Sequence, residues 1–445
     1  MSVRSLLDRF EPPAPELTRR LRTSRVDDSA WTRLQGVDFS SNDYLGLRES
    51  KALRDAFEHA LAKGYGGAGA SPLVTGWQGP HARLAAAISD TLGTEETLLF
   101  SSGYVANLSL LGCLFRPGDR VLVDREAHAS VIDGLKFAGV RIVRYHHNDI
   151  DHARRLIAGR EPCVALVTDG LFSMSGDLAP LAALSELCEE TATPLIVDDA
   201  HGIGVLGPDG LGVLGLAGIP YRRLAALTGT FGKAFGLAGA FVSGESRLVQ
   251  HLVQRARGFI YSTSIPTLQA GALESIWPQV MGSDTAPSYV DREYVAPGNN
   301  GVLGRVARAR LHGNIYLWRT LCADADIPIP DCPGPIQPLL LGSADAAVRL
   351  ADKACEAGLL LTAFRPPTVP PGTSRIRIAL SAAHSEADLT RLVAFLRASR
   401  ADFANDPAGA RRRLVSTRMP GQICTQTHTN TTIDAINPAP APVDA

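Results

Sequence analysis

The chain has 445 residues, of which 45% are hydrophobic, and its 44 Lys and Arg residues balance 45 Asp and Glu residues. A chain of this length and composition can bury a large core, so we expect a globular protein with one large domain and one smaller domain. The balanced charge gives no reason to expect a nucleic acid or an anionic membrane as partner, and it favours a small-molecule ligand.

The cysteines and the apolar segments bear on the cellular compartment of the protein. The seven cysteines are scattered and form no C-x-x-C pair. This pattern is typical neither of a disulfide framework nor of a zinc site, so we expect a reducing cytoplasm and no bound metal. The N-terminus lacks the apolar core of a signal peptide. The apolar stretch 224–244 contains Lys233 and five glycines, and we interpret it as a buried segment that does not span a membrane.

The chain order of the elements predicts a large domain over residues 46–280, after an N-terminal segment of residues 1–45. From about residue 95, short apolar runs alternate with helical patterns. The runs read TLLF, RVLVD, RIVRY, VALVT, PLIVDD and LAALT. Alternation of strands and helices predicts a mostly parallel sheet with helices on both faces. Ligands bind beyond the carboxyl ends of such strands, so the residues that end these runs are candidate site residues.

A smaller α+β domain is predicted over residues 281–400. It begins with a polar loop or linker at 283–301. Strands at 335–342 and 375–380 and a helix at 344–358 follow, and Ser385 with Asp388 marks the start of a final helix. Residues 401–445 are poor in large apolar side chains and rich in Thr, Pro and Ala, so we expect a disordered tail.

Three short motifs have ordinary explanations. Gly64, Gly66 and Gly69 match the dinucleotide pattern G-x-G-x-x-G, but a helical pattern precedes them where that motif needs a strand. The segment GTFGKA has neither the glycine spacing nor the final Ser or Thr of a phosphate-binding P-loop. His146 and His147 have no carboxylate or cysteine at metal-ligand spacing, so we expect both to be solvent-exposed.

The endings of two predicted strands are more informative. One ending holds Asp198, Asp199 and His201, and the other holds Ser102, Gly103 and Tyr104 at a turn into a helix. The amides and dipole of a helix N-terminus can bind a phosphate. Taken singly, each feature is equally well explained as a cap, a turn or a buried ion pair.

Together with Lys233, these groups predict a site for pyridoxal 5'-phosphate (PLP). PLP requires an amine for its aldehyde, a carboxylate for its ring nitrogen and a cup for its phosphate. Burial disfavours the charged ammonium, so the pKa of Lys233 is expected to be lowered. A neutral amine can act as a nucleophile and later as a base near neutral pH. The glycines around Lys233 allow a close approach of the backbone.

Eight segments resemble, in order and spacing, the α-oxoamine synthases. They are FSSNDYLGL, LLFSSGYVAN, DREAHAS, TDGLFSMSGD, VDDAHGIGVLG, TFGKAFG, IYSTSIP and RPPTVPPGTSRIRIALSAAH. The resemblance covers residues 38–397. It implies the α/β fold of the fold-type-I PLP-dependent transferases, with a large domain built on a mostly parallel sheet and a smaller α+β C-terminal domain.

The resemblance also implies roles for individual residues. Lys233 matches the lysine that forms a Schiff base with PLP, and Asp198 matches the partner of the pyridine nitrogen. His128 matches the imidazole stacked on the ring, and His201 the residue beside the phenolic oxygen. The other implied cofactor contacts are Ser102, Gly103, Tyr104, Ser173, Thr230 and Thr263. Thr263 matches a position that reaches the phosphate of the neighbouring subunit, which implies a homodimer.

Two positions are implied to bind substrate. Arg377 matches an arginine that binds the substrate carboxylate, and Asn42 matches a position near the substrate. The strand pattern supports the first of these, because Arg375 and Arg377 share one face while the intervening apolar residues share the other. A guanidinium binds a carboxylate with two parallel hydrogen bonds. Without the resemblance, an exposed strand face explains the two arginines equally well.

The family chemistry is a decarboxylative condensation of an amino acid with an acyl thioester carried on coenzyme A or an acyl carrier protein. The segments IQPLLLG and RPPTVPPGTSRIRI are most similar to the members that use L-alanine and a pimeloyl thioester in biotin synthesis. Glycine or serine as the amino acid, or a different acyl thioester, are alternatives within the family. A PLP-dependent aminotransferase or lyase is an alternative from another reaction class. Asp169 and Pro72 depart from the family pattern, as does the segment 282–304, and these departures bear on acyl-chain specificity.

Overall fold

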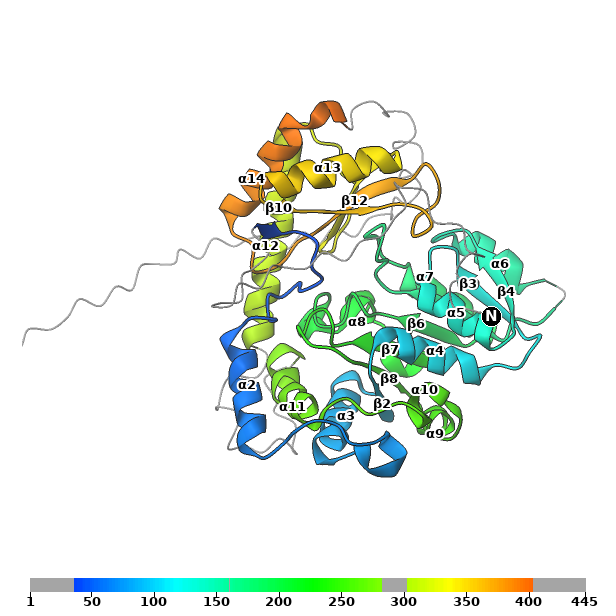
Figure 1. The fold of residues 1–445 in the computed structure, drawn as a ribbon. Coiled ribbons are helices and arrows are strands. Elements are labelled where there is room, and N and C mark those ends of the chain that lie inside the picture. The colour runs from blue at the N-terminus through cyan, green and yellow to red at the C-terminus, as the bar shows by residue number, and fades with distance from the viewer. Residues whose placement is uncertain (1–35, 160, 282–301, 403–445) are drawn as a thin grey trace, which may run out of the picture.

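The computed structural model describes residues 36–159, 161–281 and 302–402. Its centre is a seven-stranded sheet with the strand order β2-β8-β7-β6-β5-β3-β4 (Figure 1). The strands are β2 (Glu96–Phe100), β3 (Arg120–Asp124), β4 (Arg141–Tyr145), β5 (Ala165–Asp169), β6 (Leu195–Asp198), β7 (Ala226–Thr230) and β8 (Ala240–Gly244). Only β8 runs antiparallel to its neighbours β2 and β7. The predicted mostly parallel sheet is therefore confirmed.

Successive residues of these strands point to opposite sides, so the sheet has two apolar faces. Helices cover both faces. Val121 and Val123 of β3 pack in one core with α4 (Gly103–Leu114), α5 (Ala129–Phe137), α9 (Ser246–Arg255) and α10 (Arg257–Ile260). Leu122 of the same strand packs in the core of the other face. The helices of that face are α3 (Gly79–Leu92), α6 (Ile150–Ile157), α7 (Leu181–Glu190), α8 (Gly212–Ala217) and α11 (Thr267–Met281).

A second, smaller sheet lies in the upper part of Figure 1. Its antiparallel strands are β9 (Ile336–Gly342), β11 (Thr362–Phe364) and β12 (Ser374–Ala379), in the order β11-β12-β9. The helices of this part are α12 (Val302–Asp324), α13 (Ala344–Glu356) and α14 (Glu386–Ala398). The predicted capping box is present, since the side chains of Ser385 and Asp388 accept each other's backbone N–H. The strands and helices predicted for residues 335–400 are thus confirmed.

The N-terminal part of the described chain joins this smaller unit. β1 (Val37–Asp38) pairs in parallel with β10 (Leu359–Leu360), far away in the sequence. Phe39 is fully buried, and its carbonyl accepts a hydrogen bond from the N–H of Ala379, at 2.8 Å. The segment that leads to Asn42 is therefore attached to the end of β12.

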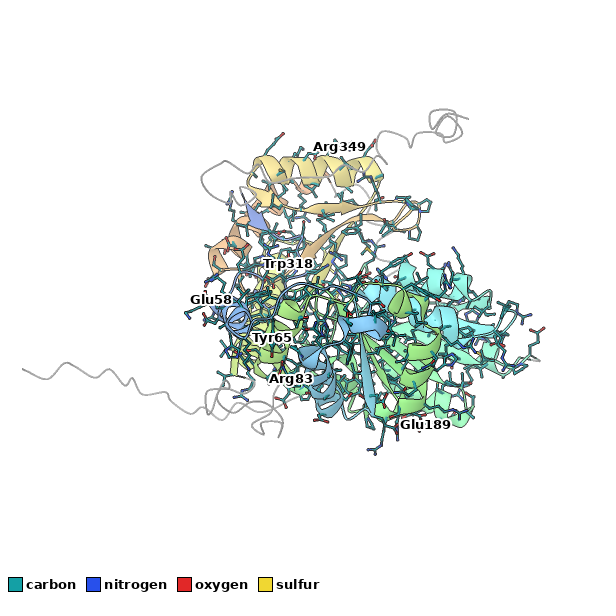
Figure 2. All side chains as sticks on the ribbon, turned by 60° about the horizontal axis from the view of Figure 1, so that its bottom comes forward. Glu58, Tyr65, Arg83, Glu189, Trp318 and Arg349 are labelled. Carbon is teal, nitrogen blue, oxygen red and sulfur yellow. The ribbon has the colours of Figure 1, made fainter. Side chains whose placement is uncertain are left out.

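Helices α2 (Lys51–Ala62), α3 and α11 pack together beside the large sheet. Arg83 of α3 donates to Glu274 of α11, at 2.6 Å, and to the hydroxyl of Tyr65, at 3.1 Å. Arg83 and Tyr65 are labelled in Figure 2. Trp318 of α12 is fully buried. The remaining short helices are η2 (Pro72–Gly76), η3 (Pro208–Gly210), η4 (Tyr221–Arg223) and η5 (Arg400–Asp402). Because α2 precedes Gly64, the glycine-rich segment follows a helix and not the strand that a dinucleotide-binding motif needs.

The apolar stretch 224–244 forms β7, the segment with Lys233, and β8, all within the large sheet. No helix among the described residues is long and apolar enough to cross a membrane. The six described cysteines are free thiols, of which Cys188, Cys322 and Cys332 are buried and Cys355 is exposed. The predicted linker at 283–301, the predicted tail from residue 403 and residues 1–35 lie outside the described residues, and the domain boundaries stay predictions.

Candidate active site

A cavity of about 200 Å³ opens at the carboxyl ends of β5, β6 and β7, where open α/β sheets bind their ligands. The described residues that line it are Gly103, Tyr104, His128, Asp169, Asp198, Ala200, His201, Thr230 and Lys233. The structure therefore brings together predicted site residues from segments more than a hundred positions apart. It also adds Asp169, which ends β5.

Lys233 lies in the tight connection between β7 and β8. The backbone is held there by hydrogen bonds from Phe231 N to Gly239 O and from Leu237 N to Phe231 O, both of 2.9 Å. Phe231 and Phe235, on either side of the lysine, are fully buried against Trp277. Burial lowers the pKa of Lys233 to about 8, although the Asp198 carboxylate opposes the shift. Near neutral pH a larger fraction of this amine is neutral, and therefore nucleophilic, than of an exposed lysine.

The carboxylate of Asp198 is fixed at the end of β6. One oxygen accepts from Asn107 Nδ2, at 2.5 Å, and the other from Ala200 N, at 3.0 Å. These two hydrogen bonds fix the orientation of the carboxylate, the group that a pyridine nitrogen requires as partner. Asn107 is missing from the predicted site. It follows Gly103 by four residues on α4, so the helical repeat placed it on the same face as the helix N-terminus.

His128 and His201 both line the cavity, and each is oriented by a hydroxyl group. His128 Nδ1 lies 2.7 Å from Ser130 Oγ, and its backbone N–H donates to Asp169. His201 Nδ1 lies 2.8 Å from the hydroxyl of Tyr44. Burial lowers the pKa of both histidines, and the Lys233 ammonium lowers them further. Both rings are therefore neutral at physiological pH.

A chain of polar contacts leads from His201 to Arg377. The Tyr44 hydroxyl donates to Asn42 Oδ1, at 3.1 Å, and Arg377 Nη2 donates to the same oxygen, at 3.0 Å. Because Tyr44 has a single hydroxyl hydrogen, it accepts from the Nδ1–H of His201 when it donates to Asn42. Tyr44 is absent from the predicted set, although it lies within the quoted segment FSSNDYLGL.

Arg377 is buried and only partly satisfied. Its Nη1 donates to the carbonyl of Ser173, at 3.3 Å, and its guanidinium carbon lies 4.8 Å from the ring centroid of Phe364. No described residue accepts a hydrogen bond from its buried Nε. A buried donor without a partner is costly, so this edge of the guanidinium is suited to an anionic ligand.

The N-terminus of α4 faces Thr230. A Cβ placed on Gly103 would lie 3.9 Å from Thr230, so space remains between them. The first N–H groups of a helix have no partner within the helix, and they attract anions. The side chain of Ser102 accepts from Val105 N, at 3.2 Å, and so caps this helix. An amine, a carboxylate, an imidazole and an open helix N-terminus in one cavity fit the requirements of PLP.

Three predicted cofactor contacts are not among the described residues that line the cavity: Ser102, which caps α4, Ser173 and Thr263. Thr263 lies with Trp77 and His81 beside a separate hollow. Ser173 contributes its carbonyl to Arg377 and is not among the residues that line the cavity. Asp199 is buried away from the cavity, where burial raises its pKa to about 8 and its carboxyl group accepts from Val213 N. Asp199 thus supports the local backbone.

The model of the aminotransferase class I and II family matches residues 35–396. The chain belongs to this family. It is 38% identical over 388 residues to 8-amino-7-oxononanoate synthase of Dechloromonas aromatica, which covers 86% of this chain and 95% of that protein. A solved 8-amino-7-oxononanoate synthase from Francisella tularensis is 27% identical, with a TM-score of 0.67 over 84% of this chain and 99% of that chain.

A solved serine palmitoyltransferase from Sphingomonas wittichii is 25% identical, with a TM-score of 0.73 over 82% of this chain and 88% of that chain. These relatives confirm the resemblance to the α-oxoamine synthases within the aminotransferase class I and II family. They also confirm the predicted fold-type-I architecture. The roles of individual residues in this family member stay predictions.

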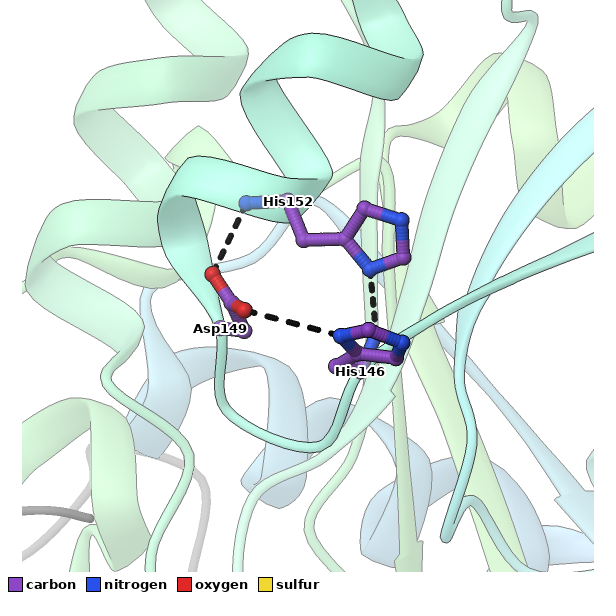
Figure 3. A group of neighbouring side chains, drawn as sticks. All are labelled: His146, Asp149 and His152. Carbon is purple, nitrogen blue, oxygen red and sulfur yellow. Dashed lines mark hydrogen bonds and ion pairs between the residues drawn. The ribbon is translucent and has the colours of Figure 1, made fainter.

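One expectation about the histidines is wrong. His146 is exposed as predicted, but His147 is largely buried and contacts two aspartates. A carboxylate also lies near His146, because Asp149 Oδ2 is 3.7 Å from its Nδ1 (Figure 3). Asp149 is the N-cap residue of α6, and the rings of His146 and His152 lie beside each other at its start. Asp149 accepts from His152 N, and His152 Nδ1 accepts from His146 N, at 2.8 and 3.0 Å.

Proposed function

We propose that this chain is a PLP-dependent acyltransferase that condenses L-alanine with a pimeloyl thioester. The products are 8-amino-7-oxononanoate, carbon dioxide and a free thiol, as in biotin synthesis. The relatives named 8-amino-7-oxononanoate synthase support this product. The observation that carries the proposal is that Lys233, with its lowered pKa, lines one cavity together with Asp198, His128 and His201.

The described residues divide the binding of PLP between them. Lys233 would hold the aldehyde carbon, Asp198 the ring nitrogen, and the α4 N-terminus with Thr230 the phosphate. Bound PLP supplies an electron sink for the electron pair left on the amino acid when a bond to Cα breaks. Asn107 keeps Asp198 oriented, so the carboxylate presents its charge in one direction.

The protein's contribution to the reaction is orientation and proton transfer. Arg377 would bind the carboxylate of L-alanine and so fix the direction of the Cα–H bond, which matters for rate as well as affinity. Lys233 Nζ would accept the α-proton, since its lowered pKa keeps part of the amine neutral. Because the rings of His128 and His201 are neutral, they place no second positive charge beside the amine of Lys233.

An absorbance titration of the purified holoenzyme tests the substrate. L-Alanine, glycine and L-serine are added separately, followed by pimeloyl-coenzyme A or a pimeloyl carrier protein. We expect the PLP absorbance to change with L-alanine, and thiol and carbon dioxide to appear only after the thioester is added. Thiol release with glycine or serine would move the substrate within the same family. Transfer of the amino group without thiol release would indicate an aminotransferase, and a chain that never takes up PLP would contradict the proposal.

We further propose a homodimer whose subunits share the site through Thr263. Thr263 lies away from the cavity of its own chain, and apolar side chains nearby are exposed, with Val74 at 73% and Tyr261 at 71%. Such exposure is typical of an interface. Sedimentation equilibrium should give twice the chain mass of 47.3 kDa. Tyr261→Asp should shift this mass to that of one chain, and a wild-type protein that sediments as a monomer would contradict the dimer.

We also propose a cytoplasmic location. The six described cysteines are free thiols, including the exposed Cys355. Thiols of this kind are typical of a reducing compartment.

A further inference from the structure

His147 connects two aspartates from different parts of the fold. Its Nδ1 lies 2.9 Å from Asp124 Oδ1, and its Nε2 lies 2.7 Å from Asp177 Oδ2. Only 18% of its side chain is exposed, and its ring packs nearly perpendicular to that of Phe172, at a centroid distance of 4.4 Å. Both carboxylates act as acceptors, so both ring nitrogens donate, which requires the protonated imidazolium.

The first aspartate belongs to the rigid part of the protein. Asp124 ends β3 and is fully buried. Its carboxylate also accepts from the backbone N–H groups of Glu126 and Asn148, at 2.8 and 3.0 Å. The position of the imidazolium is therefore set by the central sheet.

The second aspartate belongs to a loop of residues 171–178, whose two ends form a bridge between Leu171 and Leu178. We name this segment the 171–178 loop. Asn148, the neighbour of His147, also holds the loop, because its Nδ2 donates to Asp177 and to the carbonyl of Leu178, at 3.2 and 3.0 Å. The side chain of Ser175 donates to the other oxygen of Asp177. This side of the loop is thus attached to the sheet.

The other side of the 171–178 loop contacts the smaller unit through three consecutive carbonyls. Ser173 O accepts from Arg377 Nη1, at 3.3 Å, and Met174 O accepts from Arg375 Nη1, at 3.1 Å. Ser175 O accepts from Cys332 Sγ, also at 3.1 Å. A shift of the loop would therefore move the acceptor that orients the guanidinium of Arg377.

We propose that His147 is a positioning residue, which fixes the 171–178 loop to the central sheet and thereby orients Arg377 for the carboxylate of the amino acid. This inference rests on the proposed function, because it assigns Arg377 to that carboxylate. The charge state supports it. Burial alone would lower the pKa of His147, but the hydrogen bonds with Asp124 and Asp177 outweigh burial and raise the pKa to about 10.

The test compares His147→Gln with His146→Gln in the PLP-loaded full chain. His146 is the adjacent histidine, is exposed, and contacts Asp149 and His152, which lie outside the loop (Figure 3). Losing one charge-assisted contact to the loop should raise the KM for L-alanine about tenfold. We expect kcat and the affinity for PLP to stay within about twofold, because Lys233 and Asp198 are unaffected. A purely structural role would lower the unfolding temperature without raising the KM of the folded variant.

A second readout keeps the inference falsifiable if His147→Gln does not fold. Asp177→Asn removes the other charge of the pair at a more exposed position, and the same rise in KM is expected. Equilibrium binding of L-alanine, followed by the PLP absorbance, reports on Arg377 without any thioester. An unchanged alanine affinity in the folded variants would overturn the role of His147 alone. A wild-type chain that binds PLP but no amino acid would overturn the proposed function as well.

Discussion

Lys233→Ala is expected to reduce turnover by on the order of ten-thousand-fold, because one side chain is proposed both to hold the cofactor aldehyde and to accept the α-proton. Among the described residues that line the cavity, Lys233 alone carries an amine. Alanine leaves the backbone of the β7–β8 connection intact, since the flanking Phe231 and Phe235 remain buried. The measurement is thiol release from pimeloyl-coenzyme A in the presence of L-alanine, together with the visible absorbance of bound PLP.

The matched control is Lys51→Ala on α2, whose side chain is 81% exposed and pairs with Asp55. Exposed ion pairs contribute little, so this variant should keep wild-type turnover and PLP absorbance. If Lys233→Ala kept more than a tenth of the wild-type turnover, the proposed mechanism would be wrong. Equal losses in both variants would point to a general effect of removing lysines.

Arg377→Gln should raise the KM for L-alanine by about a hundredfold, which corresponds to the upper range for hydrogen bonds to charged groups. The guanidinium is buried, is held by Asn42 and Ser173, and keeps one donor edge without an acceptor in the described chain. Glutamine retains a polar side chain but neither the charge nor the fork that binds a carboxylate. The measurement is steady-state kinetics with varied L-alanine at a saturating concentration of thioester.

Two comparisons separate charge from geometry at this position. Arg377→Lys keeps the charge but loses the parallel hydrogen bonds, so its KM should lie between those of the wild type and Arg377→Gln. Arg349→Gln, at an exposed position on α13 of the same unit (Figure 2), should leave the KM unchanged. An unaltered KM for L-alanine in Arg377→Gln would exclude Arg377 as the carboxylate ligand.

The strand endings could be predicted from the sequence because the signal is local. Asp198 and His201 follow an apolar run, and Gly103 opens a helix directly after another, so strand topology places both at one edge of the sheet. The supporting contacts could not be predicted in this way. Tyr44 reaches His201 across 157 residues of sequence, and no periodicity or spacing indicates such a contact.

The environment of His147 could not be predicted from its neighbours in the sequence. Its neighbours in sequence suggested an exposed pair of histidines, whereas its partners Asp124 and Asp177 lie 23 and 30 residues away on either side. Whether a histidine is exposed or buried depends on what the tertiary fold places around it. Asn107, by contrast, lies one helical turn after Gly103, and a search of that helix face would have found it.

The burial of the cysteines has a practical consequence for following the proposed reaction. A released thiol can be detected with an aromatic disulfide reagent, which reacts with thiolates and therefore also with accessible protein cysteines. Burial raises the pKa of Cys188, Cys322 and Cys332 to about 12, so these thiols stay protonated and shielded. Among the described cysteines, the exposed Cys355 is expected to consume reagent first. Preincubation of the native enzyme with the reagent should exhaust this background before substrate is added, and the assay then counts product thiols alone.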